Sequence, residues 1–175
     1  RVVSSRGIDV AAAAFETAFE EVQVPHSTAL HARNRATGTP YLVGPIARVM
    51  GNLDHLSPAA AAAHASLAER FASPDPAASV FARGIEVIQA MDDALAVLDA
   101  DLPPPAEPQA VPRAGTGHAV TEAPRGILYV SLETDAAGDV QRLRIVPPTS
   151  QNQAQIEADL RALAPRILAI PEDEG

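Results

Sequence analysis

The sequence predicts an α+β fold, in which a helix-dominated bundle is accompanied by one small antiparallel β-hairpin. Apolar residues recur at three- and four-residue spacing from about Ala77 to Asp99, which is typical of a long amphipathic helix. Ser57-Pro58 indicates a helix start, because serine caps the first turn and proline suits the first helical position. Two apolar runs, 127–134 and 140–146, flank a turn-rich loop and indicate the hairpin.

Further helices follow from the spacing of apolar residues. Phe15, Phe19 and Val22 are placed at i, i+4 and i+7, so they should share the buried face of one helix. In the last helix, the buried stripe is expected to contain Ile156, Leu160 and Leu163. The segments predicted to be helical are 10–22, 46–52, 58–72 and a C-terminal helix that begins near Ser150.

The rest of the chain is predicted to be extended or irregular. Short strands are expected at 1–5 and 41–43. Residues 101–112 contain five prolines and should form an extended, exposed connector. A length of 175 residues suits one domain, so residues 1–175 are expected to be a single domain or a fragment of a larger subunit.

Composition excludes several classes of function. With 13 Lys+Arg against 22 Asp+Glu, the net charge is −9, and the chain has no basic stripe that could bind nucleic acid. No apolar run approaches the roughly 20 residues needed to span a bilayer, so no membrane span is expected. The chain contains no cysteine, and therefore has neither a disulfide framework nor a thiolate metal site.

Two short motifs carry candidate site residues. In Glu122-Ala-Pro-Arg-Gly, Arg125 precedes an apolar strand, and its forked guanidinium suits an anion or a carboxylate. A surface ion pair between Arg125 and Glu122 is the plainer interpretation. After Pro147-Pro148, the hydroxyls of Thr149 and Ser150 could cap the following helix or donate a hydrogen bond into a nearby site.

The histidines do not predict a metal site. Their spacings match no H-x-x-x-H or H-E-x-x-H pattern, and no acidic residues cluster with them in the sequence. A structural or solvent-exposed role is therefore expected for all of them, namely His26, His31, His55, His64 and His118.

Several collinear segments resemble the large subunit of nickel–iron hydrogenases, and most closely its soluble branch that exchanges electrons with NAD(P) or related carriers. The resemblance covers essentially the whole chain, and it implies that the chain adopts part of the hydrogenase large-subunit fold. Val130 departs from it, since the family usually has histidine there. The matching segments are 1–9, 26–31, 41–48, 54–58, 121–129 and 147–153.

The resemblance implies an oxidoreductase that oxidises hydrogen reversibly and passes the electrons to an iron–sulfur small subunit. In the full-length family member, a Ni–Fe(CN)₂CO centre is held by two Cys-x-x-Cys pairs, and soft thiolates are the ligands that such a centre needs. The present chain has neither pair. It is therefore expected to hold no metal and to be inactive in isolation, and it is interpreted as a central to C-terminal portion of such a protein.

The resemblance also implies roles for the two motifs. Arg125 is implied as the catalytic residue above the metals, acting by electrostatic positioning, with Glu122 orienting it. Pro124 is implied to line the pocket of the diatomic ligands, and Thr149, or less favourably Ser150, to hydrogen-bond a cyanide.

Partners and alternatives follow from the same resemblance. The expected partners are the iron–sulfur small subunit of the hydrogenase, together with NAD(P)-reactive subunits, and the expected location is the cytoplasm. The main alternative is a natural cysteine-less relative that acts as a scaffold, assembly or interface protein. A third interpretation is kinship to the quinone-site subunit of respiratory complex I, which shares the fold and lacks the cysteines.

Overall fold

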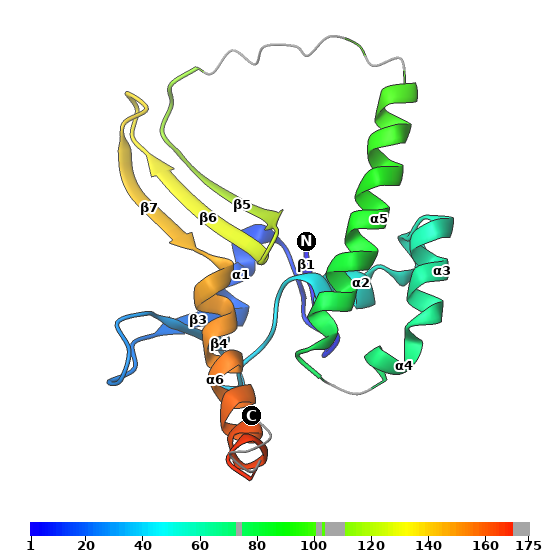
Figure 1. The fold of residues 1–175 in the computed structure, drawn as a ribbon. Helices are drawn as coiled ribbons and strands as arrows, with labels where there is room; N and C mark the ends of the chain where they lie inside the picture. Colours follow the sequence, from blue (N-terminus) through cyan, green and yellow to red (C-terminus); the bar gives the residue numbers. More distant parts are fainter. Residues whose placement is uncertain (73–74, 101–102, 104–110, 170–175) are drawn as a thin grey trace. The chain divides into compact units, whose positions relative to one another are not determined.

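The computed structural model describes residues 1–72, 75–100, 103 and 111–169, and it contains both helices and small antiparallel sheets (Figure 1). The predicted mixed α and β class is confirmed. Contacts divide the chain into two compact units, of which the first comprises 1–44, 118–131 and 144–175. The proline-rich connector predicted at 101–112 lies largely outside the described residues, and the single-domain-or-fragment interpretation stays a prediction. Within the described part, no helix is long and apolar enough to cross a membrane.

The N-terminal part of the first unit forms two short antiparallel pairs. Strand β1 (Val2–Val3) pairs with β2 (Asp9–Val10), which confirms the predicted strand near the N-terminus. Strand β3 (Phe19–Val22) pairs with β4 (His31–Asn34), so that Phe19 lies opposite Asn34 and Val22 opposite His31.

The helix predicted at 10–22 is wrong. The segment instead contains a 3₁₀ turn, η1 (Ala12–Ala14), one short helix, α1 (Phe15–Ala18), and then strand β3. Phe15 and Phe19 are buried as expected, because a helical turn followed by a strand also brings them to one core. Pairing with β4 overrides the local helical spacing of the apolar residues.

The predicted hairpin is present within a three-stranded sheet of order β5-β6-β7. Strands β6 (Gly126–Thr134) and β7 (Val140–Val146) agree with the expectation, while β5 (Gly115–Ala123) was not predicted. Strand β5 is mostly exposed and polar, so its sequence lacks the apolar alternation that reveals a strand. Residues 41–43, predicted as a strand, form no strand in the described structure.

Helix α6 (Pro148–Ile167) follows β7 and packs against β4. Its predicted buried stripe is wrong, because Ile156, Leu160 and Leu163 are all exposed. Burial is confined to its first two turns, where the buried residues are Pro148, Ser150, Gln151 and Ala154.

The aromatic side chains of the first unit form its core, although aromatic residues make up only 3% of the chain. The Phe15 and Tyr129 rings stack with centroids 4.4 Å apart, and Phe19 and Val146 complete the buried cluster with Val2. The Tyr129 hydroxyl donates to Glu16 Oε2 at 3.3 Å, and burial raises the pKa of Tyr129.

The second unit contains the helices of residues 45–100. Its core joins Val49, Ala60, Ala82 and Ile85. The long apolar repeat forms a helix as predicted, but the residues Met91, Leu95 and Leu98 of its second half are exposed. The helix predicted at 58–72 is interrupted at Leu67. The elements are α2 (Pro45–Gly51), η2 (Leu53–His55), α3 (Pro58–Ser66), α4 (Ala68–Phe71) and α5 (Ala78–Asp99).

Ser57 caps α3, as the sequence predicts. Its Oγ accepts from the Ala60 backbone N–H at 3.2 Å and donates to Asp92 Oδ2 on α5 at 2.5 Å. Replacing Ser57 by alanine is expected to lower the free energy of unfolding by about 1–2 kcal/mol, since the cap and the contact with Asp92 are both lost. The matched control is Ser66→Ala, whose hydroxyl only bonds back to the Ala63 carbonyl within α3. Urea denaturation of both variants should show a clear loss for Ser57→Ala alone, and equal losses would contradict this role.

Candidate functional site

The β5–β6 turn, the start of α6 and the segment before α2 meet in the first unit, and each contains a motif singled out from the sequence. Asn152 of α6 joins them through its amide. Its Oδ1 accepts from the Val43 backbone N–H at 2.8 Å, and its Nδ2 donates to the Arg125 carbonyl at 3.1 Å. Segments more than 100 residues apart in the sequence are thus held together by one side chain.

Two glycines permit the close approach of these backbones. Gly44 has a φ of +112°, and a Cβ placed there would lie 2.8 Å from the Arg125 carbonyl oxygen. Gly126 has a φ of +133°, and its Cβ would collide with the Val43 side chain. Both positions therefore require glycine for conformation and for space.

Gln151, next to Asn152, fastens the ends of β6 and β7. It is fully buried, and its Nε2 donates to the carbonyls of Ile127 at 2.7 Å and Val146 at 3.2 Å. Its Oε1 accepts from the Tyr41 hydroxyl at 3.3 Å, and burial raises the pKa of Tyr41 well above its usual range. Sequence reasoning missed both amides, although they directly follow Thr149-Ser150 in the same motif.

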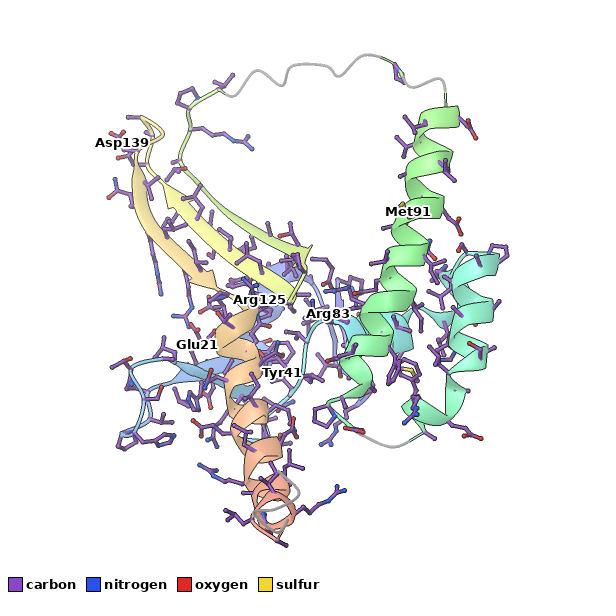
Figure 2. All side chains as sticks on the ribbon, viewed as in Figure 1. Glu21, Tyr41, Arg83, Met91, Arg125 and Asp139 are labelled. Carbon is purple, nitrogen blue, oxygen red and sulfur yellow. The ribbon has the colours of Figure 1, made fainter. Side chains whose placement is uncertain are left out.

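Arg125 lies at the turn between β5 and β6 and is exposed (Figure 2). Its guanidinium has no hydrogen bond or ion pair within the described part of the chain, so the plain interpretation of a surface pair with Glu122 is not supported. Glu122 ends its exposed strand close to the turn, and Pro124 precedes Arg125 in it. The backbone at Arg125 is fixed by Asn152 and Gly44, while its side chain reaches solvent.

The two hydroxyl residues do not cap α6, which corrects one of the two interpretations of this pair. The N-cap position is Pro147, and Thr149 and Ser150 both lie inside the first turn of the helix. Ser150 is buried and its Oγ donates to the Pro147 carbonyl at 3.0 Å. Thr149 is exposed and lies in the same helical turn as Asn152.

The chemistry of these side chains is that of a cation and hydrogen-bond donors. Arg125 carries a permanent positive charge, Thr149 has a hydroxyl, and the N-terminus of α6 adds a partial positive charge. Such a set attracts anionic groups but supplies no soft metal ligand, and the chain has no cysteine. The residues present therefore do not fit as the ligands of a thiolate-held nickel–iron centre.

Comparisons with known proteins indicate relatives of one kind, although no family model matches the chain. The chain is 30% identical over 166 residues to the alpha chain of sulfhydrogenase 1 from Pyrococcus furiosus, covering 93% of this chain and 38% of that protein. It is 30% identical over 148 residues to a vhu component of the F420-non-reducing hydrogenase of Methanococcus voltae, covering 81% of this chain and 35% of that protein. The chain thus spans little more than a third of the length of these relatives.

A solved structure agrees with these relatives in fold. The NAD⁺-reducing [NiFe]-hydrogenase in its H₂-reduced state superposes with a TM-score of 0.60 at 23% identity, over 85% of this chain and 35% of that one. The fold and the sequence therefore indicate the same family. The chain is homologous to part of the nickel–iron hydrogenase large subunit, and it is related to this family over most of its own length.

Proposed function

We propose that the chain is a portion of a nickel–iron hydrogenase large subunit, and that it supplies residues that surround the active site without binding its metals. The full enzyme would oxidise hydrogen reversibly and pass the electrons to an iron–sulfur small subunit. The hydrogenase names of the two relatives support this proposal. Because the chain offers no thiolate, the metal ligands must come from outside these 175 residues, and the chain alone is inactive in this proposal.

The observation that carries the proposal is the convergence of three motifs around Arg125. The bonds of Asn152 to Val43 and Arg125 fix the backbone of the turn, which leaves the guanidinium free to act on something other than its own fold. A fixed cation beside the N-terminus of α6 favours bound anions. Cyanide ligands of the kind implied for this family would meet that requirement.

Each site residue has a distinct proposed role. Arg125 positions and stabilises charge, because a guanidine pKa above about 12 makes it a poor base. Thr149 donates a hydrogen bond to a cyanide, and Pro124 lines the pocket of the diatomic ligands. Glu122 orients Arg125, and Ser150 is the weaker candidate for the cyanide bond because its hydroxyl already donates to Pro147.

The proposed partners are the iron–sulfur small subunit of the hydrogenase, together with NAD(P)-reactive subunits, and the proposed location is the cytoplasm. Exposed apolar residues on two helices supply contact surface for such partners. They include Met91, Leu95 and Leu98 on α5 and Ile156, Leu160 and Leu163 on α6.

The role of Thr149 can be tested by infrared spectroscopy of the complete protein that contains this chain. Thr149→Val keeps the shape of the side chain but removes the donor, so the cyanide stretching bands should shift. Ser150→Ala is the matched comparison, and it should leave those bands in place because the Ser150 hydroxyl donates to the Pro147 carbonyl. A shift in Ser150→Ala alone would transfer the role to Ser150, and unshifted bands in both variants would contradict a hydroxyl donor at this site.

The absence of cysteine favours one other function, that of a non-catalytic scaffold or interface protein. Metal analysis separates the two possibilities. Stoichiometric nickel in the native protein that contains this chain supports the hydrogenase proposal, and a metal-free native protein supports the scaffold.

A further inference from the structure

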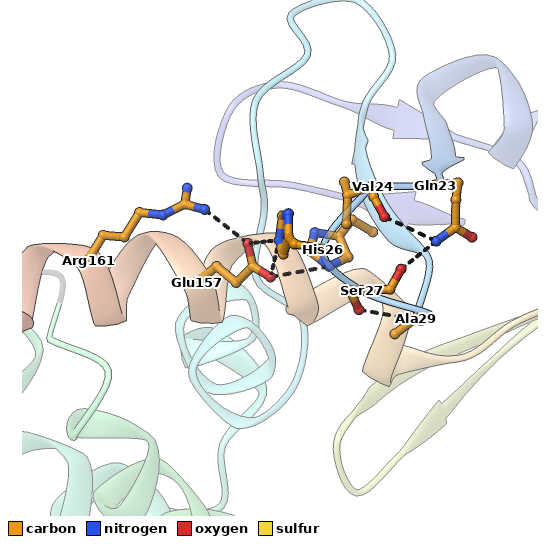
Figure 3. A network of polar contacts seen from close by, with 8 residues as sticks. Gln23, Val24, His26, Ser27, Ala29, Glu157 and Arg161 are labelled. Carbon is orange, nitrogen blue, oxygen red and sulfur yellow. Dashed lines mark hydrogen bonds and ion pairs between the residues drawn. The ribbon is translucent and has the colours of Figure 1, made fainter.

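Two histidines and one carboxylate meet on the first unit, away from the motif residues discussed above (Figure 3). His26 lies in the loop that follows β3, His31 begins β4, and Glu157 projects from α6. His26 Nε2 lies 3.0 Å from Glu157 Oε1 and 3.1 Å from Oε2. His31 Nε2 lies 3.4 Å from Oε1, and one ligand atom from each of the three residues falls within 4.8 Å of the others.

The buried histidine of this cluster has an unused nitrogen. His31 is only 1% exposed, and its Nε2 makes no hydrogen bond within the described part of the chain. The Glu157 carboxylate is near enough for an ion pair but lacks hydrogen-bond geometry towards this atom. Buried polar nitrogens are nearly always bonded, so His31 Nε2 points to a partner that the protein itself does not supply.

The donor set and its spacing suit a transition-metal ion. Two imidazole nitrogens with one carboxylate oxygen form a recurrent zinc-binding set with an open fourth position. Tetrahedral bonds of about 2.0–2.1 Å place neighbouring ligand atoms roughly 3.3–3.4 Å apart. The separations from Glu157 Oε1 to the two histidine nitrogens, 3.0 and 3.4 Å, need only small adjustment to reach this spacing.

The surroundings of the cluster also favour a bound ion. Arg161, one turn further along α6, contacts Glu157 Oε2 at 3.3 Å and so can orient the carboxylate with Oε1 towards the histidines. The His26 side chain is 55% exposed, so water can reach the open position. His26 also holds the pKa of Glu157 below its usual range, which keeps the carboxylate charged.

We propose that His26, His31 and Glu157 bind a divalent first-row transition metal of the zinc type, and that the ion fastens the β3–β4 loop and β4 to α6. This site is separate from the proposed hydrogenase function and needs no cysteine. The sequence spacing did not predict it, because the two histidines are five residues apart and their carboxylate follows 126 residues after His31. Only the packing of α6 against β4 brings the three residues together.

The test uses the tag-free 175-residue chain, stripped of metal with a chelator. Zinc binding is measured by competition with a chromophoric chelator, and cobalt(II) is added separately as a spectroscopic probe. We expect one zinc ion per chain, a visible cobalt band typical of nitrogen and oxygen ligands in a tetrahedral site, and a higher melting temperature with zinc. Glu157→Gln and His26→Ala should each weaken zinc binding by about tenfold or more and abolish the cobalt band.

The control is His55→Ala, which removes an exposed histidine that lies outside the cluster and should leave binding unchanged. Because His31 is buried and its replacement can unfold the chain, the conclusion depends on Glu157→Gln and His26→Ala. Equal zinc affinity in both of these variants and the unmodified chain would overturn the proposal. It would also be overturned if zinc left the melting temperature unchanged while Glu157→Gln lowered it in metal-free buffer, since the cluster would then be an ion pair alone.

Discussion

Arg125→Lys in the complete hydrogenase that contains this chain is expected to lower hydrogen-driven dye reduction by about 100-fold while the nickel content stays unchanged. Removing one preorganised donor from an active site costs roughly 10²–10³ in rate. Lysine keeps the charge but loses the planar, forked donor geometry, so the substitution isolates the geometry of the guanidinium. Dye reduction and nickel content are measured on the same purified sample.

The structure makes this result easy to interpret. Asn152 bonds the carbonyl of Arg125 and not its side chain, so the turn should keep its backbone in the variant. Arg142→Lys is the matched control, because this exposed arginine lies on β7 outside the turn. Unchanged activity in Arg125→Lys would identify a solvated arginine without function. A parallel loss of nickel and activity would indicate a role in assembly.

Gly44→Ala is expected to lower the free energy of unfolding of the 175-residue chain by about 3 kcal/mol. A non-glycine residue in such a backbone conformation costs about 1–3 kcal/mol. The new Cβ would also lie 2.8 Å from the Arg125 carbonyl oxygen, which is backbone and has little room to move. Urea denaturation followed by circular dichroism measures the difference.

The matched control for this second prediction is Gly38→Ala. Gly38 also has a positive φ, +67°, but no atom lies within 4 Å of a Cβ added there. Its replacement should therefore cost only the conformational penalty, about 1–2 kcal/mol. If the two variants were equally destabilised, the contact between Gly44 and the Arg125 turn would not matter for stability.

Much of the fold could be predicted where local signals and burial agree. The helix start at Ser57-Pro58 and the long α5 repeat were both readable, because capping and apolar spacing act over a few residues. Strand β3 was not readable, because its strand conformation depends on pairing with β4. The buried face of α6 was misjudged for a similar reason, since its apolar stripe stays exposed in the described part of this chain.

The site was predictable in part. The motif around Arg125 could be located from its resemblance to a family, and the structure adds what fixes it. Asn152 and Gln151 act through side-chain bonds to distant backbone groups, and such bonds leave no periodic pattern in a sequence. Their roles appear only when the three motifs are seen together.

The bonds of Asn152 have a consequence for how the chain can vary during evolution. Its amide addresses the backbone of positions 43 and 125, and only an amide can both accept and donate there without carrying charge. Mutations at position 125 can therefore be sampled without loosening the turn, whereas position 152 admits almost no replacement. The scaffold and the reactive group are thus inherited as separate units, and selection can retune one while the other persists.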